Sequence, residues 1–245
     1  MKRRILGEFR GIKADIISHQ VWETSANALI LHLPQARSTL SSRDGFRKIS
    51  VVCNCYLPES LWSSFHDYPD TWKTYLKEVL NEINQSPDEA TALSTGVNME
   101  HLAWAEEVYE QLWVLTFVTA GVKSNAMRVG KDRASNAERN GQFKEVGTIN
   151  IILLTNASLN AAALAASFIT ITEAKNIALQ ELDVRSSYNP GWQATGTGTD
   201  EIVVIPGRDI QCTYVGGHTK IGELMARTVT SATIDAIRKE SNVSD

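Results

Sequence analysis

Small polar residues gather in the loops of the second half of this 245-residue chain, most densely in ATGTGTD at 194–200. Two glycines alternate there with three threonines before Asp200. Such a loop exposes many backbone amides, which suit a phosphate or the oxyanion of an acyl transfer. It lacks both the Gly-Lys-Ser/Thr ending of a P-loop and the spacing of a dinucleotide-binding turn. A phosphate- or nucleotide-binding use of the loop therefore stays open without a motif to support it.

The segment YVGGHTKIGEL at 214–224 leads into a predicted helix and contains His218. Amides at a helix N-terminus favour negative charge, and a histidine exchanges protons near neutral pH. The other four histidines lack a neighbouring carboxylate or glycine loop and are interpreted as structural: His19, His32, His66 and His101. No HxxxH, HExxH or CxxC spacing is present, so we predict no metal site. The alternative metal ligand set is Glu173, Asp200, His218 and Glu223.

Two further blocks carry polar residues beside predicted strands. AGVKSNAMRVGKD at 120–132 follows a strand and exposes Ser124 and Asn125 at a glycine turn, as a site or merely as a tight turn. In GTINII at 147–152, Thr148 and Asn150 share one face of a strand. Polar groups on an apolar strand must be hydrogen-bonded or face a site. Glu173 lies among apolar helix residues, and burial and exposure both stay open for it.

Hydrophobic periodicity predicts the elements that position these blocks. Apolar or alternating runs predict strands at Asn27–Leu33, Lys48–Cys55, Trp113–Thr119, Thr148–Thr155, Glu201–Ile205 and Gln211–Val215. Spacing of i, i+3 and i+4 predicts helices at Thr71–Asn84, Asn98–Leu112, Asn160–Leu182 and His218–Lys239. The polar segment 128–145 predicts a long mobile loop that serves as a lid. Together these predict a mixed α/β or α+β fold, with a mixed sheet packed with helices in one domain covering 1–245.

Composition bounds the function classes. Hydrophobic residues make up 43% and charged residues 21%, and the formal net charge is −4, which gives no general attraction to nucleic acid or anionic membrane. Three cysteines argue against a disulfide framework, and Cys53 and Cys55 are interpreted as buried apolar residues. The basic N-terminal segment lacks the apolar core of a secretory signal. The longest apolar stretch, 161–169, is shorter than the roughly 20 residues of a membrane span. We expect a cytoplasmic location.

These blocks, in this order, resemble the adenosylcobinamide amidohydrolase family. The matching segments are AGVKSNAMRVG, GTINIILLTN, ITEAKNIALQELDVRSS, ATGTGTDEIVV and GGHTKIGELMA. Weaker similarity extends into the N-terminal part, including the turn LSS at 40–42, and the loop 133–144 is covered least. Several long blocks in the same order are more specific than one short motif.

The resemblance implies hydrolysis of the amide that joins the aminopropanol arm of adenosylcobinamide to its corrin ring. The products would be adenosylcobyric acid and 1-amino-2-propanol, and the acid would re-enter cobalamin synthesis. The substrate is a corrinoid that carries its own cobalt, so no further cofactor is expected. A corrinoid-binding protein of the same fold without the reaction is the alternative. Nucleic acid and membrane insertion are not expected, and homo-oligomerisation stays open.

Amide hydrolysis needs a nucleophile or activated water, an oxyanion site, and a proton for the leaving amine. From side-chain chemistry we predict catalytic groups at His218, Asp200, Glu173 and Thr199. We predict substrate contacts at Ser124, Asn125, Arg128, Asn150, Thr197, Gly198 and Gly217. Thr199 or Ser124 as a nucleophile would need an adjacent base. Direct attack by water and an acyl-enzyme therefore both stay open.

Overall fold

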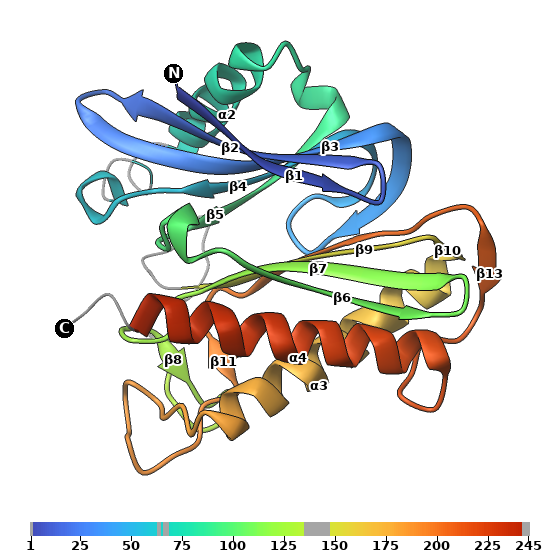
Figure 1. The fold of residues 1–245 in the computed structure, drawn as a ribbon. Coiled ribbons are helices and arrows are strands. Elements are labelled where there is room, and N and C mark those ends of the chain that lie inside the picture. Colours follow the sequence, from blue (N-terminus) through green and yellow to red (C-terminus); the bar gives the residue numbers. More distant parts are fainter. Residues whose placement is uncertain (1, 63–64, 66–68, 135–147, 242–245) are drawn as a thin grey trace.

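The computed structural model describes residues 2–62, 65, 69–134 and 148–241 (Figure 1). Its strands are β1 Lys2–Phe9, β2 Ile12–Val21, β3 Thr24–Ser41, β4 Gly45–Tyr56, β5 Ala90–Thr95, β6 Ala103–Tyr109, β7 Leu112–Ala120, β8 Ala126–Met127, β9 Ile149–Thr155, β10 Ala157–Leu159, β11 Gly196–Thr197, β12 Glu201–Ile205 and β13 Ile210–Cys212. Its helices are α2 Pro69–Glu82, α3 Ala161–Glu181 and α4 Lys220–Ser241, with short 3-10 turns at Glu59–Leu61, Pro87–Glu89 and Met99–His101. This confirms the mixed α/β prediction.

One large mixed sheet curls so that its two halves face each other. Figure 1 shows α2 above the half formed by β1 to β5, and α3 and α4 below the half formed by β6, β7 and β9. The strand order is β1-β2-β3-β12-β9-β7-β6, and β4 pairs with both β3 and β5. Because each half has an apolar face toward the other and another toward helices, the layers stack helix, sheet, sheet, helix.

The long strand β3 connects the two halves. Its first part pairs with β2 and β4, and its last residues pair with β12. The pairing register with β4 shifts between His32 and Arg37, and Pro34 lies within that interval. Proline has no backbone N–H to donate to a ladder, so it is tolerated at such an irregularity. The chain can therefore leave one half of the sheet and enter the other.

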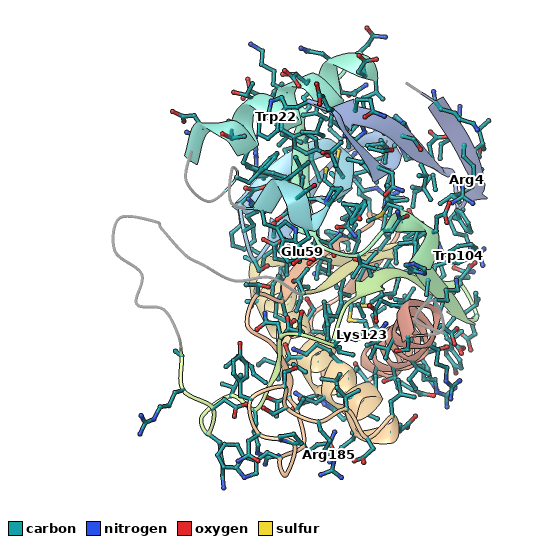
Figure 2. The ribbon with its side chains drawn as sticks, turned by 90° about the vertical axis from the view of Figure 1, so that its left-hand side faces the viewer. Arg4, Trp22, Glu59, Trp104, Lys123 and Arg185 are labelled. Carbon is teal, nitrogen blue, oxygen red and sulfur yellow. The ribbon has the colours of Figure 1, made fainter. Side chains whose placement is uncertain are left out.

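Three apolar clusters fill the spaces between the layers. The central one lies between the sheet halves and includes Leu31, Phe117 and Val203. A second lies between the lower half and the helices α3 and α4, and a third lies under α2. Figure 2 shows side chains filling these spaces, with Trp104 on the edge strand β6 and Lys123 beside α4, where it pairs with Glu240.

Most predicted elements are confirmed. Strand β12 has the predicted bounds, and β9 and the three long helices agree within a few residues. Strand β13 is shorter than predicted and ends at Cys212. By length and composition α3 is apolar enough to cross a membrane, which the sequence did not lead us to expect, and half of its apolar window is buried in the fold. The predicted lid falls largely on residues 135–147, outside the described residues.

The predicted helix Asn98–Leu112 is wrong. Residues 99–101 form one 3-10 turn, and residues 103–109 form the edge strand β6, paired antiparallel with β7 from Ala103 opposite Val118 onward. The turn between the strands is tight, because Tyr109 pairs with Leu112 and Glu110 adopts a positive φ of 52°. Cross-strand pairing with the apolar strand β7 outweighed a weak helical spacing, as tertiary context commonly overrides local propensity.

Candidate active site

Three of the polar segments meet at one end of the lower sheet half. Strand β9 runs parallel to β12, which places Asn150 opposite Glu201. Strand β7 runs antiparallel to β9, which places Thr119 opposite Asn150. The end of β7 and the starts of β9 and β12 therefore lie side by side. The structure thus brings together the blocks AGVKSNAMRVGKD, GTINII and ATGTGTD, each of which contains predicted site residues.

Asp200 ties the Gly-Thr loop to its surroundings. Its carboxylate forms an ion pair with Lys175 of α3 and accepts hydrogen bonds from the backbone N–H and hydroxyl of Thr197. It also accepts the backbone N–H of Ile149 at 3.2 Å. Both charged side chains are largely buried, with 8% of Lys175 and 14% of Asp200 exposed. Asp200 therefore joins α3, the loop and β9, and its oxygens are already engaged.

A glycine is required beside this ion pair. A Cβ atom on Gly196 would lie 2.5 Å from Asp200 Oδ2 and 2.6 Å from Lys175 Nζ, closer than such atoms approach. The Thr197 amide is bonded to Asp200 rather than directed at an external anion. Thr197 is buried, whereas Gly198 and Thr199 are exposed at the tip. The loop is thus held by Asp200, and only its tip faces solvent.

A buried chain of amides and hydroxyls connects the two sheet halves beneath this loop. Asn150 Nδ2 donates to Asn54 Oδ1 at 2.8 Å and to the Ser94 carbonyl at 2.9 Å. Asn54 Nδ2 donates to Thr119 Oγ1 at 2.9 Å. The Thr148 hydroxyl donates to the Thr199 carbonyl at 2.6 Å. Thr148 and Asn150 lie on one face, as predicted, and of the two alternatives for them the structure shows hydrogen bonding, because Asn150 is fully buried and contacts protein groups.

This buried chain predicts a large effect on stability. Replacing Asn54 with Ala removes the acceptor of one Asn150 Nδ2 hydrogen bond and the donor to Thr119 Oγ1, and each unpaired buried polar group costs about 1–3 kcal/mol. The free energy of unfolding should therefore fall by at least about 2 kcal/mol in urea denaturation. Asn176→Ala is the control, because Asn176 donates to the Thr172 carbonyl within its own helix turn. Equal stability of the two variants would contradict the assignment.

An ion pair that sequence reasoning missed lies next to Asp200 and the buried amide network. Glu201 Oε1 lies 3.3 Å from Arg43 Nη1, and Glu201 Oε2 accepts the Ser94 backbone N–H at 3.2 Å. Arg43 Nη1 also donates to Ser94 Oγ at 3.0 Å, and its guanidinium lies 4.4 Å from the centre of the Trp72 ring. Both side chains of the pair are partly accessible to solvent, since 19% of the Glu201 side chain and 28% of the Arg43 side chain are exposed.

Burial raises the pKa of Glu201, and the nearby Arg43 opposes that rise. A carboxylate with a raised pKa is suited to proton transfer near neutral pH. The sequence contained only indirect indications that Glu201 and Arg43 belong to a site. Glu201 directly follows Asp200 in the third block, and Arg43 directly follows the LSS turn at 40–42. Nothing local in the sequence indicates that the two meet across 158 positions.

The first polar block packs under the Gly-Thr loop. Strand β8 pairs with β11, placing Ala126 opposite Thr197. Asn125 is buried and accepts the Tyr188 hydroxyl at 3.0 Å. Arg128 donates to the Gln193 carbonyl at 3.1 Å. In this block the predicted substrate contacts Asn125 and Arg128 thus bond to the protein, whereas the Ser124 residue is exposed.

The structure separates His218 from Asp200, although both were predicted as catalytic groups of one site. Lys220, at the start of α4, lies 4.7 Å from the Tyr109 ring at the β6–β7 turn. Lys239, near the other end of α4, donates to the Leu102 carbonyl. A helix of 22 residues is about 33 Å long, so His218 lies at the opposite end of the sheet from Asn150 and Asp200.

Glu173 also lies away from Asp200, on the exposed face of α3. Together with Gly217 it lines a broad groove of about 770 Å³ between α3 and α4. Most of its lining residues belong to α3 and α4, with Glu107 of β6 and the loop residue Gly217 completing it. The structure therefore brings Glu173 and Gly217 together. Asp200 and Thr199 do not line this groove. Among the residues the structure describes, no group of three His, Cys, Asp or Glu side chains is arranged to hold a metal ion.

Comparison with known proteins agrees with the sequence blocks. The model of the family described as adenosylcobinamide amidohydrolase matches residues 13–245. An uncharacterized protein of Methanocaldococcus jannaschii is 42% identical over 226 residues, covering 88% of this chain and 87% of that protein. An adenosylcobinamide amidohydrolase of Methanosarcina mazei is 32% identical over 157 residues, covering 60% of this chain and 63% of that protein.

Similarity to solved structures is weaker. A Pyrococcus horikoshii protein of known structure aligns over 86% of this chain and 77% of its own, with a TM-score of 0.44 and 10% identity. That likeness carries no argument about function. The family match, in contrast, covers almost the whole chain, including every residue of the site described above. The chain therefore belongs to the adenosylcobinamide amidohydrolase family.

Proposed function

We propose that this protein hydrolyses the amide between the aminopropanol arm and the corrin ring of adenosylcobinamide. The products are adenosylcobyric acid and 1-amino-2-propanol. The observation that carries the proposal is the accessible pair Glu201–Arg43, in which the carboxylate has a raised pKa, set on a buried and fully bonded polar base. The family description and the name of the Methanosarcina mazei relative support the substrate class.

Glu201 is the proposed acid–base residue. As a carboxylate it takes a proton from a water molecule while the water oxygen bonds to the amide carbon. Once the carbon–nitrogen bond breaks, Glu201 returns that proton to the leaving amine. Arg43 lies beside it and supplies positive charge where the amide oxygen becomes negative. This scheme uses water directly and needs no nucleophilic Thr199 or Ser124 and no added metal or cofactor.

The remaining residues hold this pair in position. The Asn54–Asn150 network fixes the Ser94 backbone, whose N–H orients the Glu201 carboxylate. Trp72 supports the Arg43 guanidinium from the other side. Asp200 fixes the loop, whose exposed tip at Gly198 and Thr199 is the proposed contact for the amide-bearing rim of the corrin. Pre-organised groups of this kind spend little energy on reorganisation during the reaction.

The proposal is tested by incubating the purified protein with adenosylcobinamide and following products by mass spectrometry. Adenosylcobyric acid and 1-amino-2-propanol should appear in equal amounts, with and without EDTA. A change in the corrin absorption spectrum with recovery of intact substrate would instead identify a corrinoid-binding protein without the reaction. Complete recovery of substrate with no spectral change would reject both the enzyme and the corrinoid-binding alternative.

A further inference from the structure

A polar cavity lies at the other end of the strands that carry the candidate site. It has a volume of about 210 Å³ and lies where β9 and β12 end and β7 begins. Strand β9 rises about 3.3 Å per residue, so its six steps from Asn150 to Asn156 place the cavity about 20 Å from the Glu201–Arg43 pair. Its lining residues are Arg10, Gln35, Arg37, Trp113, Asn156, Gly207, Arg208 and Asp209.

Three arginines from three separate segments converge on this cavity. Arg10 comes from the turn between β1 and β2, Arg37 from β3 just after its register shift, and Arg208 from the loop between β12 and β13. Asp209 is the one carboxylate among the lining residues, and Arg10 also pairs with Glu106 of β6. Positive charge therefore exceeds negative charge in the cavity wall.

Arg37 has hydrogen-bonding capacity that the described residues do not satisfy. Its Nη1 reaches the carbonyls of Thr155 and Pro206 only at 3.5 Å each. Its Nε is buried and has no hydrogen-bond partner among the residues that the structure describes. Burial lowers the pKa of Arg37, while Asp209 opposes that change. A partly buried cation with an unpaired donor is stabilised by an anion that binds to it.

The walls of the cavity are rigid. Asn156 donates to the Gln111 carbonyl at 2.7 Å and accepts the Trp113 N–H at 3.0 Å. The Gly207 N–H donates to the Ala157 carbonyl at 2.7 Å, and a Cβ on Gly207 would lie 2.3 Å from the Asn156 carbonyl oxygen. Arg208 is held by Gln35 and by the Ala36 carbonyl. The site is therefore formed before any ligand arrives.

We propose that this cavity is a binding site for a small oxyanion of the phosphate class. Guanidinium groups match the planar pairs of oxygens on such anions, and three of them converge here. The cavity is smaller than the roughly 300–1,000 Å³ of sites for drug-sized ligands, which excludes a corrin or a nucleoside. Because it lies far from Glu201, the site is independent of the proposed hydrolysis.

The experiment is calorimetric titration with inorganic phosphate in the absence of corrinoid, with sodium chloride at matched ionic strength as reference. Wild-type protein should bind phosphate, and Arg37→Gln and Arg208→Gln should each weaken binding at least about tenfold. Arg208 is exposed, so Arg208→Gln is expected to fold and to test the site even if Arg37→Gln does not fold. Arg4→Gln, on the exposed part of β1, is the matched control and should bind as wild type does.

Methyl phosphate is a phosphate monoester, so it distinguishes a site for phosphate monoesters from a site for free phosphate. Tighter binding of methyl phosphate than of phosphate would support a site for a phosphate monoester, and the reverse would support a site for free phosphate. No heat beyond that of sodium chloride, or unchanged phosphate binding in both arginine variants, would overturn the proposal. Because corrinoid is absent, this result does not depend on whether the hydrolysis is detected.

Discussion

Replacing Glu201 with Gln is expected to lower kcat for adenosylcobinamide hydrolysis by about 10²–10⁴-fold, the usual contribution of a general acid–base residue. Glutamine keeps the size of the side chain and can still accept the Ser94 N–H, but it cannot take up or return a proton. The backbone around Glu201 pairs with β9 and should be unaffected. The measurement is the initial rate of 1-amino-2-propanol release at saturating substrate, with circular dichroism to verify folding.

Glu173→Gln and His218→Ala are the matched controls, since both side chains are exposed and lie away from Asp200. We expect near wild-type rates for both. If Glu173→Gln lost activity while Glu201→Gln kept it, the groove between α3 and α4 would be the reaction site instead. That outcome would overturn the assignment made here while leaving the family membership intact.

The pH profile gives an independent check on the role of Glu201. A general base must be ionised to act, and the pKa of Glu201 is raised above the ordinary glutamate value of 4.5. The rate should therefore rise with pH through that raised pKa, so the acid limb of kcat/KM lies above the ordinary glutamate range. An acid limb at the ordinary value, or one that persists unchanged in Glu201→Gln, would exclude Glu201 as the base.

Replacing Lys175 with Met is expected to destabilise the protein by about 3–5 kcal/mol, the usual cost of removing one partner of a buried ion pair. Methionine fills much of the same volume but leaves the Asp200 carboxylate buried without its counter-charge. The remaining donors to Asp200, from Thr197 and Ile149, offset only part of this cost. Urea denaturation followed by tryptophan fluorescence measures the change.

Two further variants separate charge from packing. Lys73→Met removes an exposed ion pair with Asp70 on α2 and should have little effect on stability. The double variant Lys175→Met with Asp200→Asn removes both buried charges, so it should be more stable than Lys175→Met alone. If the double variant lost as much stability as Lys175→Met and Asp200→Asn lose together when measured singly, the pair would not be coupled.

The correspondence between sequence and structure is closest where the signal is local. The apolar run IILL at 151–154 in β9 and the run EIVVI of β12 predict buried strands, and both are confirmed. The apolar spacing that indicates a helix repeats within a few residues along the chain. The helices α2, α3 and α4 could therefore be predicted from local sequence. The alternating, Glu-rich edge strand β6 was not, because its partner β7 decides its conformation.

Helix α3 shows where local pattern fails within a correctly predicted element. It is apolar on nearly all sides, so its sequence does not identify the inward face. Glu173 and Lys175 are two positions apart, which places them about 200° apart around the helix axis. We predicted Glu173 as the functional residue, yet Lys175 is the one that turns inward to Asp200. Only the packing of α3 on the sheet and on α4 decides this.

The amino-acid sequence alone was sufficient to indicate the family and the mixed α/β class, and it selected Asp200 and Asn150 as candidate residues. The order of the strands and the packing of the helices decided which of the candidate residues lie together. Antiparallel pairing of β3 with β12 brings Arg43 to Glu201, and the full length of α4 carries His218 away from both. Periodicity and capping act over a few residues, whereas a site is assembled by contacts between segments more than a hundred residues apart. Such contacts leave no local pattern to read.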